Sequence, residues 1–227
     1  MSENGKIFIT GASGGIGSAI SDKFFKRDFK LVLTSSSDEK ISQLKDKYGD
    51  GHFYYKIDLS NSENLETCLD EISKDHKDIK IIVNNAGKTH DNIIFRMKSE
   101  QWSEVIQTNL NSNYQIIKSL LPNMLSNKYG KIIGISSIVG STGNPGQSNY
   151  VASKSGLVGL YKSIALEVAK RNINVNIISP GFISTSMTDS LNDEQKKSYL
   201  SKIPMMRFGH PDDIANLVFF LSSDESS

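Results

Sequence analysis

Short apolar runs alternate with longer amphipathic segments along almost the entire chain, and this alternation restricts the fold more than any other feature. Strands that alternate with helices are typical of βαβ units, whose parallel strands share one sheet. The predicted strands are Lys6–Thr10, Lys30–Thr34, His52–Ile57, Ile79–Asn84, Lys131–Ser136 and Asn174–Ser179. The predicted helices are Gly15–Arg27, Asp38–Tyr48, Ser62–Asp75, Ser99–Ser126, Tyr150–Lys170 and Pro211–Ser222.

Composition excludes several classes of protein. The 227 residues are 37% hydrophobic and contain no evident linker, so we predict one domain over residues 1–227. A net charge of +1 gives no general attraction to nucleic acid or anionic membrane. The single cysteine, Cys68, is predicted to be a packing residue in a reducing compartment. Because the sequence also shows no membrane span or signal peptide, we expect a soluble cytoplasmic protein.

A glycine-rich turn, Thr10–Gly17, follows the first predicted strand and opens the first helix. Gly11 permits the tight turn, Gly15 lets backbone approach a pyrophosphate, and Gly17 permits close packing of helix on strand. Backbone N–H groups at the helix N-terminus then face the phosphates. A purely structural turn is the alternative. We predict a Rossmann-type doubly wound sheet in three αβα layers, with cofactor contacts at Gly11, Ser13, Gly14, Gly15, Ile16 and Gly17.

The end of the second strand indicates which dinucleotide is bound. A carboxylate there would bind the ribose 2′-hydroxyl of NAD, but the residues present are Thr34–Ser37. Hydroxyl groups tolerate a 2′-phosphate, so the sequence favours NADP, with Ser35 as a contact. Gly14 stands where a basic residue would strengthen this preference, and Lys40 is a candidate substitute.

Three further turns follow predicted strands, at the edge of the sheet where the cofactor is expected. Asp58 either meets the adenine or caps the next helix. The small residues after Asn84 let backbone approach a ribose, and Thr185 could bond the nicotinamide carboxamide. The predicted contacts from these turns are Asp58, Leu59, Asn85, Ala86, Gly87, Pro180, Gly181, Ile183 and Thr185.

The polar segment from Thr185 to about Phe208 carries Met187, Met205 and Met206. It is interpreted either as a mobile lid over a substrate cleft or as an ordinary surface excursion.

An acid–base site is predicted from Ser137, Tyr150 and Lys154. Tyr150 and Lys154 share one helix face, and an adjacent ammonium should lower the tyrosine pKa. The Ser137 hydroxyl could hold a substrate oxygen while Tyr150 transfers a proton. Chance pairing on a helix is the alternative. Asn109, polar among apolar neighbours, is either a helix irregularity or holds a water that feeds protons to Lys154.

Together these residues resemble the short-chain dehydrogenase/reductase family. The matching pieces are Thr10–Gly17, Asn84–Gly87, Asn109, Ser137, Tyr150, Lys154 and Pro180–Gly181. The resemblance implies a catalytic tetrad in which Tyr150 is the general acid and Ser137 positions the carbonyl. It also implies that Lys154 holds the nicotinamide ribose and lowers the Tyr150 pKa, and that Asn109 supports a relay water. Tyr150 and Lys154 thus count among the cofactor contacts too.

Within the family, several stretches are most similar to 3-oxoacyl-[acyl-carrier-protein] reductases. This implies NADPH-dependent reduction in fatty-acid synthesis, an acyl-carrier protein as partner, docking at Lys128 and Arg171, and a homotetramer. A reductase of a free ketone, sugar or steroid, and a non-catalytic dinucleotide sensor, are the alternatives. The stretches are Asn84–Asn92, Arg96–Lys98, Gly146–Tyr150 and Pro180–Thr188.

The sequence ends at Asp224–Ser227, whereas the family continues into a final strand. We therefore expect the sheet edge that this strand covers to be open.

Overall fold

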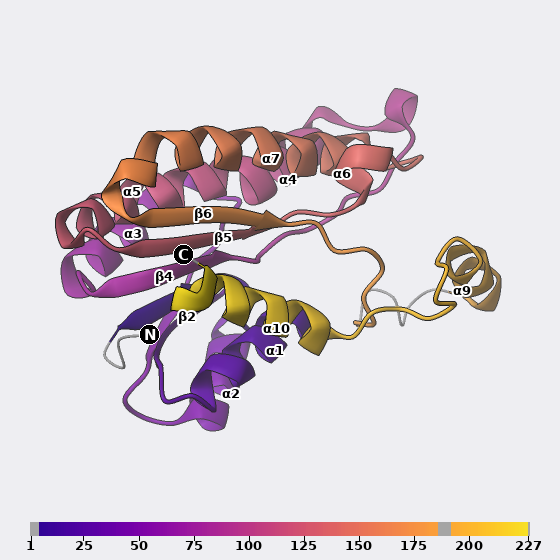
Figure 1. The fold of residues 1–227 in the computed structure, drawn as a ribbon. Coiled ribbons are helices and arrows are strands. Elements are labelled where there is room, and N and C mark those ends of the chain that lie inside the picture. Colours follow the sequence, from indigo (N-terminus) through magenta and orange to yellow (C-terminus); the bar gives the residue numbers. More distant parts are fainter. Residues whose placement is uncertain (1–4, 186–191, 227) are drawn as a thin grey trace.

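Six parallel strands form one sheet in the computed structural model, which describes residues 5–185 and 192–226 (Figure 1). The strand order is β3-β2-β1-β4-β5-β6, that of a doubly wound Rossmann-type sheet. All six predicted strands are confirmed, with ends that differ by a few residues. Their bounds are β1 Lys6–Ile9, β2 Lys30–Ser35, β3 Phe53–Lys56, β4 Ile79–Asn84, β5 Gly130–Ile135 and β6 Ile173–Ile178.

Helices cover both faces of the sheet, as Figure 1 shows. One layer contains α3, α4, α5 and α7, and the other contains α1, α2 and α10. Within the described ranges, no helix is long and apolar enough to cross a membrane. The helix bounds are α1 Gly15–Phe25, α2 Asp38–Tyr48, α3 Ser62–Asp75, α4 Ser99–Ile106, α5 Ser112–Asn127, α6 Val139–Thr142, α7 Ser148–Val168, α9 Asp193–Leu200 and α10 Pro211–Ser222.

Alternate residues of each central strand enter different cores. In β1, Phe8 packs with the α3, α5 and α7 layer, whereas Ile7 and Ile9 pack with the α1, α2 and α10 layer. Successive strand side chains point to opposite faces, so a strand buried on both faces has an uninterrupted apolar sequence. Cys68 packs against the first of these cores, and burial raises the pKa of its thiol. This placement confirms its prediction as a packing residue.

The predicted helix Ser99–Ser126 is helical but not uniform. A π-helical turn at Gln107–Asn111 separates α4 from α5. The inserted residue shifts the helix faces relative to each other, a change that hydrophobic periodicity does not reveal. This turn carries Asn109, one of the predicted catalytic residues. The other five predicted helices are confirmed. The structure adds α6 and α9, together with single 3₁₀ turns at Ile94–Arg96, Ala169–Arg171 and Asp224–Ser226.

The chain leaves β1 toward β2 and later enters β4 on the other side of β1. Connections from β1 and β4 therefore diverge, and a crevice opens where these strands end. The glycine-rich turn follows β1, and Asn85–Gly87 follows β4. The topology thus brings two predicted cofactor-binding segments to one place.

At the opposite edge, His76 ends α3 in a buried position. Its Nε2 lies 2.8 Å from the Tyr55 hydroxyl, and its ring centroid lies 4.3 Å from that of Phe53. Burial lowers the pKa of His76, and the nearby Lys6 ammonium acts in the same direction.

We expect this buried imidazole to make stability fall on acidification. The unfolded chain protonates His76 near its ordinary pKa of 6.5, whereas the folded protein resists protonation. The stability that it contributes is thus complete above that pH and is lost as the pH falls through the lowered pKa. Urea unfolding of the wild type and His76→Gln between about pH 7.5 and 5 measures this effect. The wild-type midpoint should fall more steeply, and parallel curves would contradict the assignment.

Candidate active site

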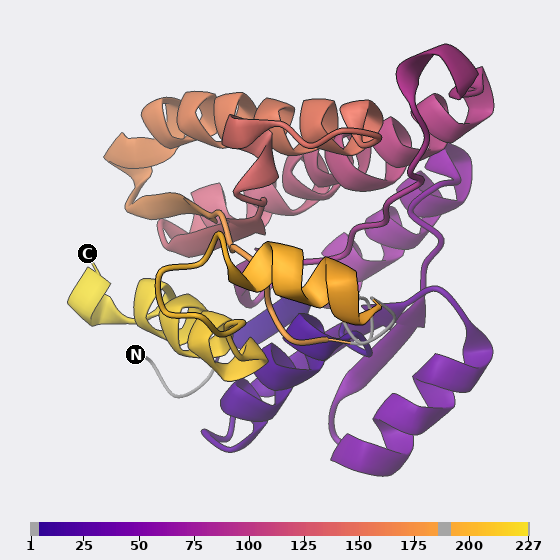
Figure 2. The same ribbon diagram turned by 90° about the vertical axis from the view of Figure 1, so that its right-hand side faces the viewer.

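A cleft of about 960 Å³ opens at the carboxyl ends of the strands. Figure 2 views the fold from this side, with α9 lying across the front. All the predicted cofactor contacts line the cleft, and so do Ser137, Tyr150 and Lys154. The structure therefore brings together residues from the loops after β1, β3, β4, β5 and β6, from the end of β2, and from α1 and α7. The contacts are Gly11, Ser13, Gly14, Gly15, Ile16, Gly17, Ser35, Asp58, Leu59, Asn85, Ala86, Gly87, Pro180, Gly181, Ile183 and Thr185.

The glycine-rich turn is packed so closely that Gly11 and Gly17 have no room for a side chain. Gly11 has a φ of 65°, and a Cβ on Gly17 would lie 2.1 Å from the Gly11 carbonyl oxygen. The side-chain nitrogen Nδ2 of Asn85 donates to the backbone carbonyls of Thr10 and Gly11, at 3.0 and 3.2 Å. The backbone of the turn is thereby fixed between β1, α1 and the segment after β4.

The N-terminus of α1 forms the end of the cleft suited to an anion. Gly14 is its N-cap, and the first turn of the helix carries no acidic residue. The positive end of the helix dipole is therefore not neutralised within this turn. The Ser13 and Ser35 hydroxyls lie 2.8 Å apart beside it, and Lys40 lines the same region.

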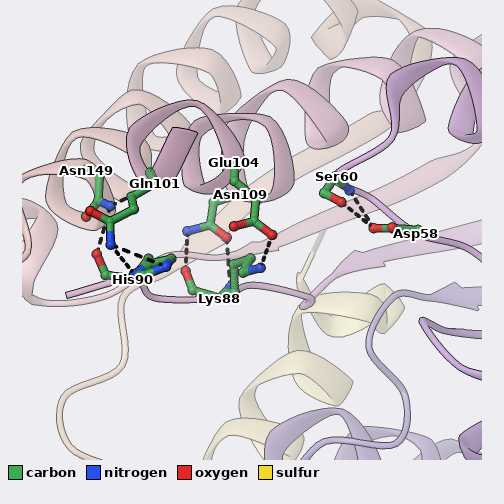
Figure 3. Close-up of polar contacts among 8 residues, drawn as sticks. All are labelled: Asp58, Ser60, Lys88, His90, Gln101, Glu104, Asn109 and Asn149. Atoms are coloured by element: carbon green, nitrogen blue, oxygen red, sulfur yellow. Dashed lines mark hydrogen bonds and ion pairs between the residues drawn. The ribbon is translucent and has the colours of Figure 1, made fainter. Parts of the chain in front are cut away.

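Asp58 does not cap the helix that follows it, so the structure excludes the capping alternative. Its Oδ1 accepts from the Ser60 amide at 2.9 Å and from the Ser60 hydroxyl at 2.7 Å (Figure 3). Asn61 is the N-cap of α3 and accepts from the Asn64 amide at 3.0 Å. These bonds to Ser60 lower the pKa of Asp58. Its carboxylate remains in the cleft wall.

Lys154 is buried beneath the catalytic part of the cleft. Its Nζ donates to the Ile135 carbonyl at 2.7 Å and lies 5.5 Å from the centroid of the Tyr150 ring. Burial lowers the pKa of Lys154 to about 8. The ammonium thus contacts the ring face of Tyr150 and holds the end of β5 against α7.

The expected effect of Lys154 on Tyr150 was wrong for this structure. Burial raises the pKa of Tyr150, a hydrogen bond with Ser137 lowers it in part, and the Asp91 charge raises it further. Lys154 directs its charge to the Ile135 carbonyl, so desolvation of the phenol outweighs any attraction to the ammonium. Tyr150 is therefore protonated and can donate its proton.

Asn109 lies behind the cleft, where its carboxamide binds protein groups. Its Oδ1 accepts from the Lys88 amide at 2.9 Å, and its Nδ2 donates to the Lys88 carbonyl at 2.9 Å (Figure 3). Its Nδ2 also donates to the Ser153 hydroxyl at 3.1 Å. A Cβ on Gly87 would lie 3.3 Å from Lys154 Nζ and 3.4 Å from Asn109 Oδ1. Asn109 thus fixes the loop after β4 close to Lys154.

A family model described as short chain dehydrogenase matches residues 6–196. The chain belongs to the short-chain dehydrogenase family. It is also similar to proteins named 3-oxoacyl-[acyl-carrier-protein] reductase FabG. That of Haemophilus influenzae is 45% identical over 98% of this chain and 92% of its own length. Those of Rickettsia bellii and Escherichia coli K12 are 47% and 41% identical, over 96% and 100% of this chain and 89% and 93% of theirs.

In this short-chain dehydrogenase the cleft wall includes residues that motif analysis did not single out as site residues. Lys88 pairs with Glu104 across the wall (Figure 3), and Asp91 and Gln147 border Tyr150's side of the cleft. The buried Thr108 hydroxyl has no partner among the described residues. Lys88 and Asp91 closely follow the carboxyl end of β4, and that position is the signal that could have found them.

The residues on either side of the segment after Thr185 are hydrogen-bonded to each other. The Ser184 amide donates to the Gly209 carbonyl at 2.8 Å, and the Gly209 amide donates to the Phe182 carbonyl at 2.9 Å. The Phe182 and Tyr199 ring centroids are 4.3 Å apart, and Tyr199 of α9 lines the cleft. In this short-chain dehydrogenase, α9 therefore contributes to the cleft wall. Met205 and Met206 are exposed, and Met187 lies outside the described residues.

Proposed function

We propose that this chain is an NADPH-dependent reductase that converts 3-oxoacyl-[acyl-carrier protein] to 3-hydroxyacyl-[acyl-carrier protein] in fatty-acid synthesis, with residues 1–227 as one cofactor-binding and catalytic domain. One observation carries the chemistry: Tyr150, Ser137 and Lys154 lie in the same cleft as the glycine-rich turn. The names of relatives at 41–47% identity support the substrate.

The residues present fit a phosphorylated dinucleotide. Gly11 and Gly17 have no room for a side chain, and the N-terminus of α1 offers N–H groups to phosphate. Ser13, Ser35 and Lys40 place two hydroxyls and an ammonium where a 2′-phosphate would be accommodated. The Thr108 hydroxyl, which has no partner among the described residues, gives the cleft lining a further hydrogen-bonding group.

The chain's own groups supply positioning and the proton. The Ser137 hydroxyl donates a hydrogen bond to the substrate carbonyl oxygen, while the protonated Tyr150 phenol transfers its proton to that oxygen. When bound, the dihydronicotinamide supplies the hydride that reaches the carbonyl carbon, so hydride and proton together convert the ketone to an alcohol. Lys154 holds the nicotinamide ribose, and Asn109 keeps the adjacent loop in place.

The deciding experiment measures NADPH oxidation with acetoacetyl-linked carrier protein, beside NADH and a free β-keto ester. Fast turnover with NADPH and the carrier-linked substrate is expected. Turnover confined to the free ester would assign the protein to reductases of small ketones. Cofactor binding without any turnover would instead favour a dinucleotide sensor.

Ser35→Asp is expected to reverse the cofactor preference. Ser35 is buried at the end of β2, 2.8 Å from the Ser13 hydroxyl, so a carboxylate there would face a 2′-phosphate at short range. The KM for NADPH should rise at least about tenfold, since like charges at such a distance repel strongly, while the KM for NADH changes less. Steady-state kinetics with both cofactors measures the ratio. Ser35→Ala is the control, and it should leave the KM for NADPH within a few-fold of the wild type.

For the partner, we propose Lys128 and Arg171 as contacts for the acidic carrier protein. Both side chains are exposed. The side-chain nitrogen Nδ2 of Asn172 donates to the Lys128 carbonyl at 3.3 Å, so the segments that carry Lys128 and Arg171 are adjacent. They precede β5 and β6, whereas the cleft follows these strands, about 20 Å away along a six-residue strand. We propose that a carrier docked there serves the cleft of another copy in a homotetramer.

Reversing both charges, in Lys128→Glu with Arg171→Glu, should raise the apparent KM for carrier-linked substrate by about tenfold or more. A small thioester that lacks the carrier should be turned over as in the wild type. Salt should weaken the wild-type interaction and have less effect on the variant. Equal effects on both substrates would remove these residues from the docking surface.

A further inference from the structure

A buried chain of hydrogen bonds lies behind the cleft and joins the end of β4 to α7 and α5. The side-chain nitrogen of Asn84 donates to the Tyr161 hydroxyl at 2.8 Å, and this hydroxyl donates to Asn113 Oδ1 at 2.8 Å. Asn113 Nδ2 then donates to the backbone carbonyl of Asn109 at 2.9 Å. Each of these residues is at most 2% exposed, so water does not compete for the bonds.

The direction of these bonds follows from the Asn109 carbonyl, which can only accept a hydrogen bond. The Asn113 amide therefore turns its nitrogen toward Asn109 and its oxygen toward Tyr161. The Tyr161 hydroxyl donates to this oxygen and accepts from Asn84. Burial raises the pKa of Tyr161, so the hydroxyl keeps the proton that it shares with Asn113. A side chain without a hydroxyl at this position could make neither bond.

The network ends at the π-helical turn that separates α4 from α5. Ser112 Oγ donates to the Thr108 carbonyl at 2.6 Å, and Asn113 Nδ2 reaches the Asn109 carbonyl in the same way. Side chains that bond to the carbonyl four residues earlier compete with the regular backbone pattern and often bend a helix. Asn113 thus supports the irregular geometry of the turn, and Tyr161 holds the Asn113 side chain in place.

The Asn109 side chain connects this turn to the backbone of the proton donor. Its Nδ2 donates to the Ser153 hydroxyl at 3.1 Å, and that hydroxyl donates to the Tyr150 carbonyl at 2.7 Å. The same carboxamide binds the amide and the carbonyl of Lys88 (Figure 3). The first turn of α7 and the loop after β4 are therefore both fixed by one side chain of the π-helical turn.

We propose that Asn113 and Tyr161 are positioning residues for the proton donor, because they hold the π-helical turn that fixes the start of α7. The proposal rests on the proposed function insofar as Tyr150 is the proton donor of a reduction. Neither Asn113 nor Tyr161 is among the described residues that line the cleft. They act on the reaction through the backbone that they hold in place.

Tyr161→Phe removes the hydroxyl and keeps the ring. Misplacement of reacting groups by about 1 Å costs about a hundredfold in rate, so the single-turnover rate with acetoacetyl-linked carrier protein should fall at least about tenfold. The KM for NADPH should stay within about twofold of the wild type, because no cleft residue changes. Asn113→Leu should have the same effect. The double variant should lose no more than either single one, since residues that act as a unit are not additive.

Tyr48→Phe is the matched control. Tyr48 is also buried, and its hydroxyl donates to Asp22 Oδ1 at 2.8 Å, between α2 and α1. Removal of this hydroxyl should lower the urea midpoint, as in Tyr161→Phe, but leave the single-turnover rate at the wild-type value. A loss of rate that only reflects lower stability would be the same in both variants and would overturn the proposal.

Hydrogen exchange of the protein without cofactor gives a readout that needs no substrate. Peptides that cover residues 104–113 and 148–156 should exchange faster in Tyr161→Phe than in the wild type or in Tyr48→Phe. Wild-type exchange together with a wild-type rate would overturn the proposal, as would additive losses in the double variant. If the wild type lacked turnover, the proposed function would fail, and the exchange would still decide whether the network holds the turn. If Tyr161→Phe did not fold, Asn113→Leu would carry both measurements.

Discussion

Tyr150→Phe is expected to lower the rate of reduction by about a thousandfold, the range of a lost general acid. The substitution removes one hydroxyl and leaves the ring, so the contact with the Lys154 ammonium at 5.5 Å is retained. Cofactor affinity and unfolding temperature should therefore stay close to those of the wild type. Rapid-reaction measurement of NADPH oxidation separates the chemical step from product release.

Ser137→Ala provides the matched comparison. It removes the hydroxyl that bonds Tyr150 and is expected to hold the substrate oxygen. We expect a loss of about a hundredfold, because one hydrogen bond to developing charge is lost while the proton donor stays. A Tyr150→Phe variant with wild-type turnover would exclude the phenol as proton donor.

Gly17→Ala is expected to destabilise the protein by about 3 kcal/mol and to weaken cofactor binding severely. The added Cβ would lie 2.1 Å from the Gly11 carbonyl oxygen and 2.6 Å from the Asn85 amide nitrogen. Alanine gains about 1 kcal/mol of helix propensity over glycine, which does not offset displacement of a backbone carbonyl. Urea unfolding and titration with NADPH measure the two effects.

Gly14→Ala is the control for the turn. A Cβ at Gly14 would meet the Gly11 carbonyl oxygen at 3.5 Å, an ordinary contact, and its φ of −80° suits any residue. Its unfolding free energy should stay within about 0.5 kcal/mol of the wild type. If Gly14→Ala and Gly17→Ala were equally destabilised, close packing at Gly17 would not be the cause.

Local sequence was sufficient to predict the strands of the sheet and the glycine-rich turn at the cofactor site. Apolar runs such as Ile79–Asn84 are short and bounded by polar turns, so their type follows from length and composition. The geometry of the turn Thr10–Gly17 follows from its own sequence, because Gly11 supplies a positive φ and Gly17 leaves room for the Gly11 carbonyl. Since parallel strands end at one edge, contacts as distant as Gly11 and Thr185 could be placed together before their positions were known.

Features that depend on tertiary surroundings could not be predicted. The π-helical turn at Gln107–Asn111 leaves no periodic signal, although it aims Asn109 at Lys88. The Tyr150 pKa depends on burial and on where Lys154 directs its ammonium, neither of which follows from a spacing of four residues. Helix α9 is short and polar, so its sequence resembles that of a loop.

The hydrogen-bonded junction of Phe182, Ser184 and Gly209 makes the intervening segment separable from the rest of the enzyme. Its two ends are hydrogen-bonded to each other, so a change in the number of residues between them need not displace the sheet. Doubling the length of such a loop costs only about 0.6 kcal/mol in closure entropy. Evolution or a designer can therefore exchange this module to accept other acyl groups without rebuilding the proton-transfer machinery.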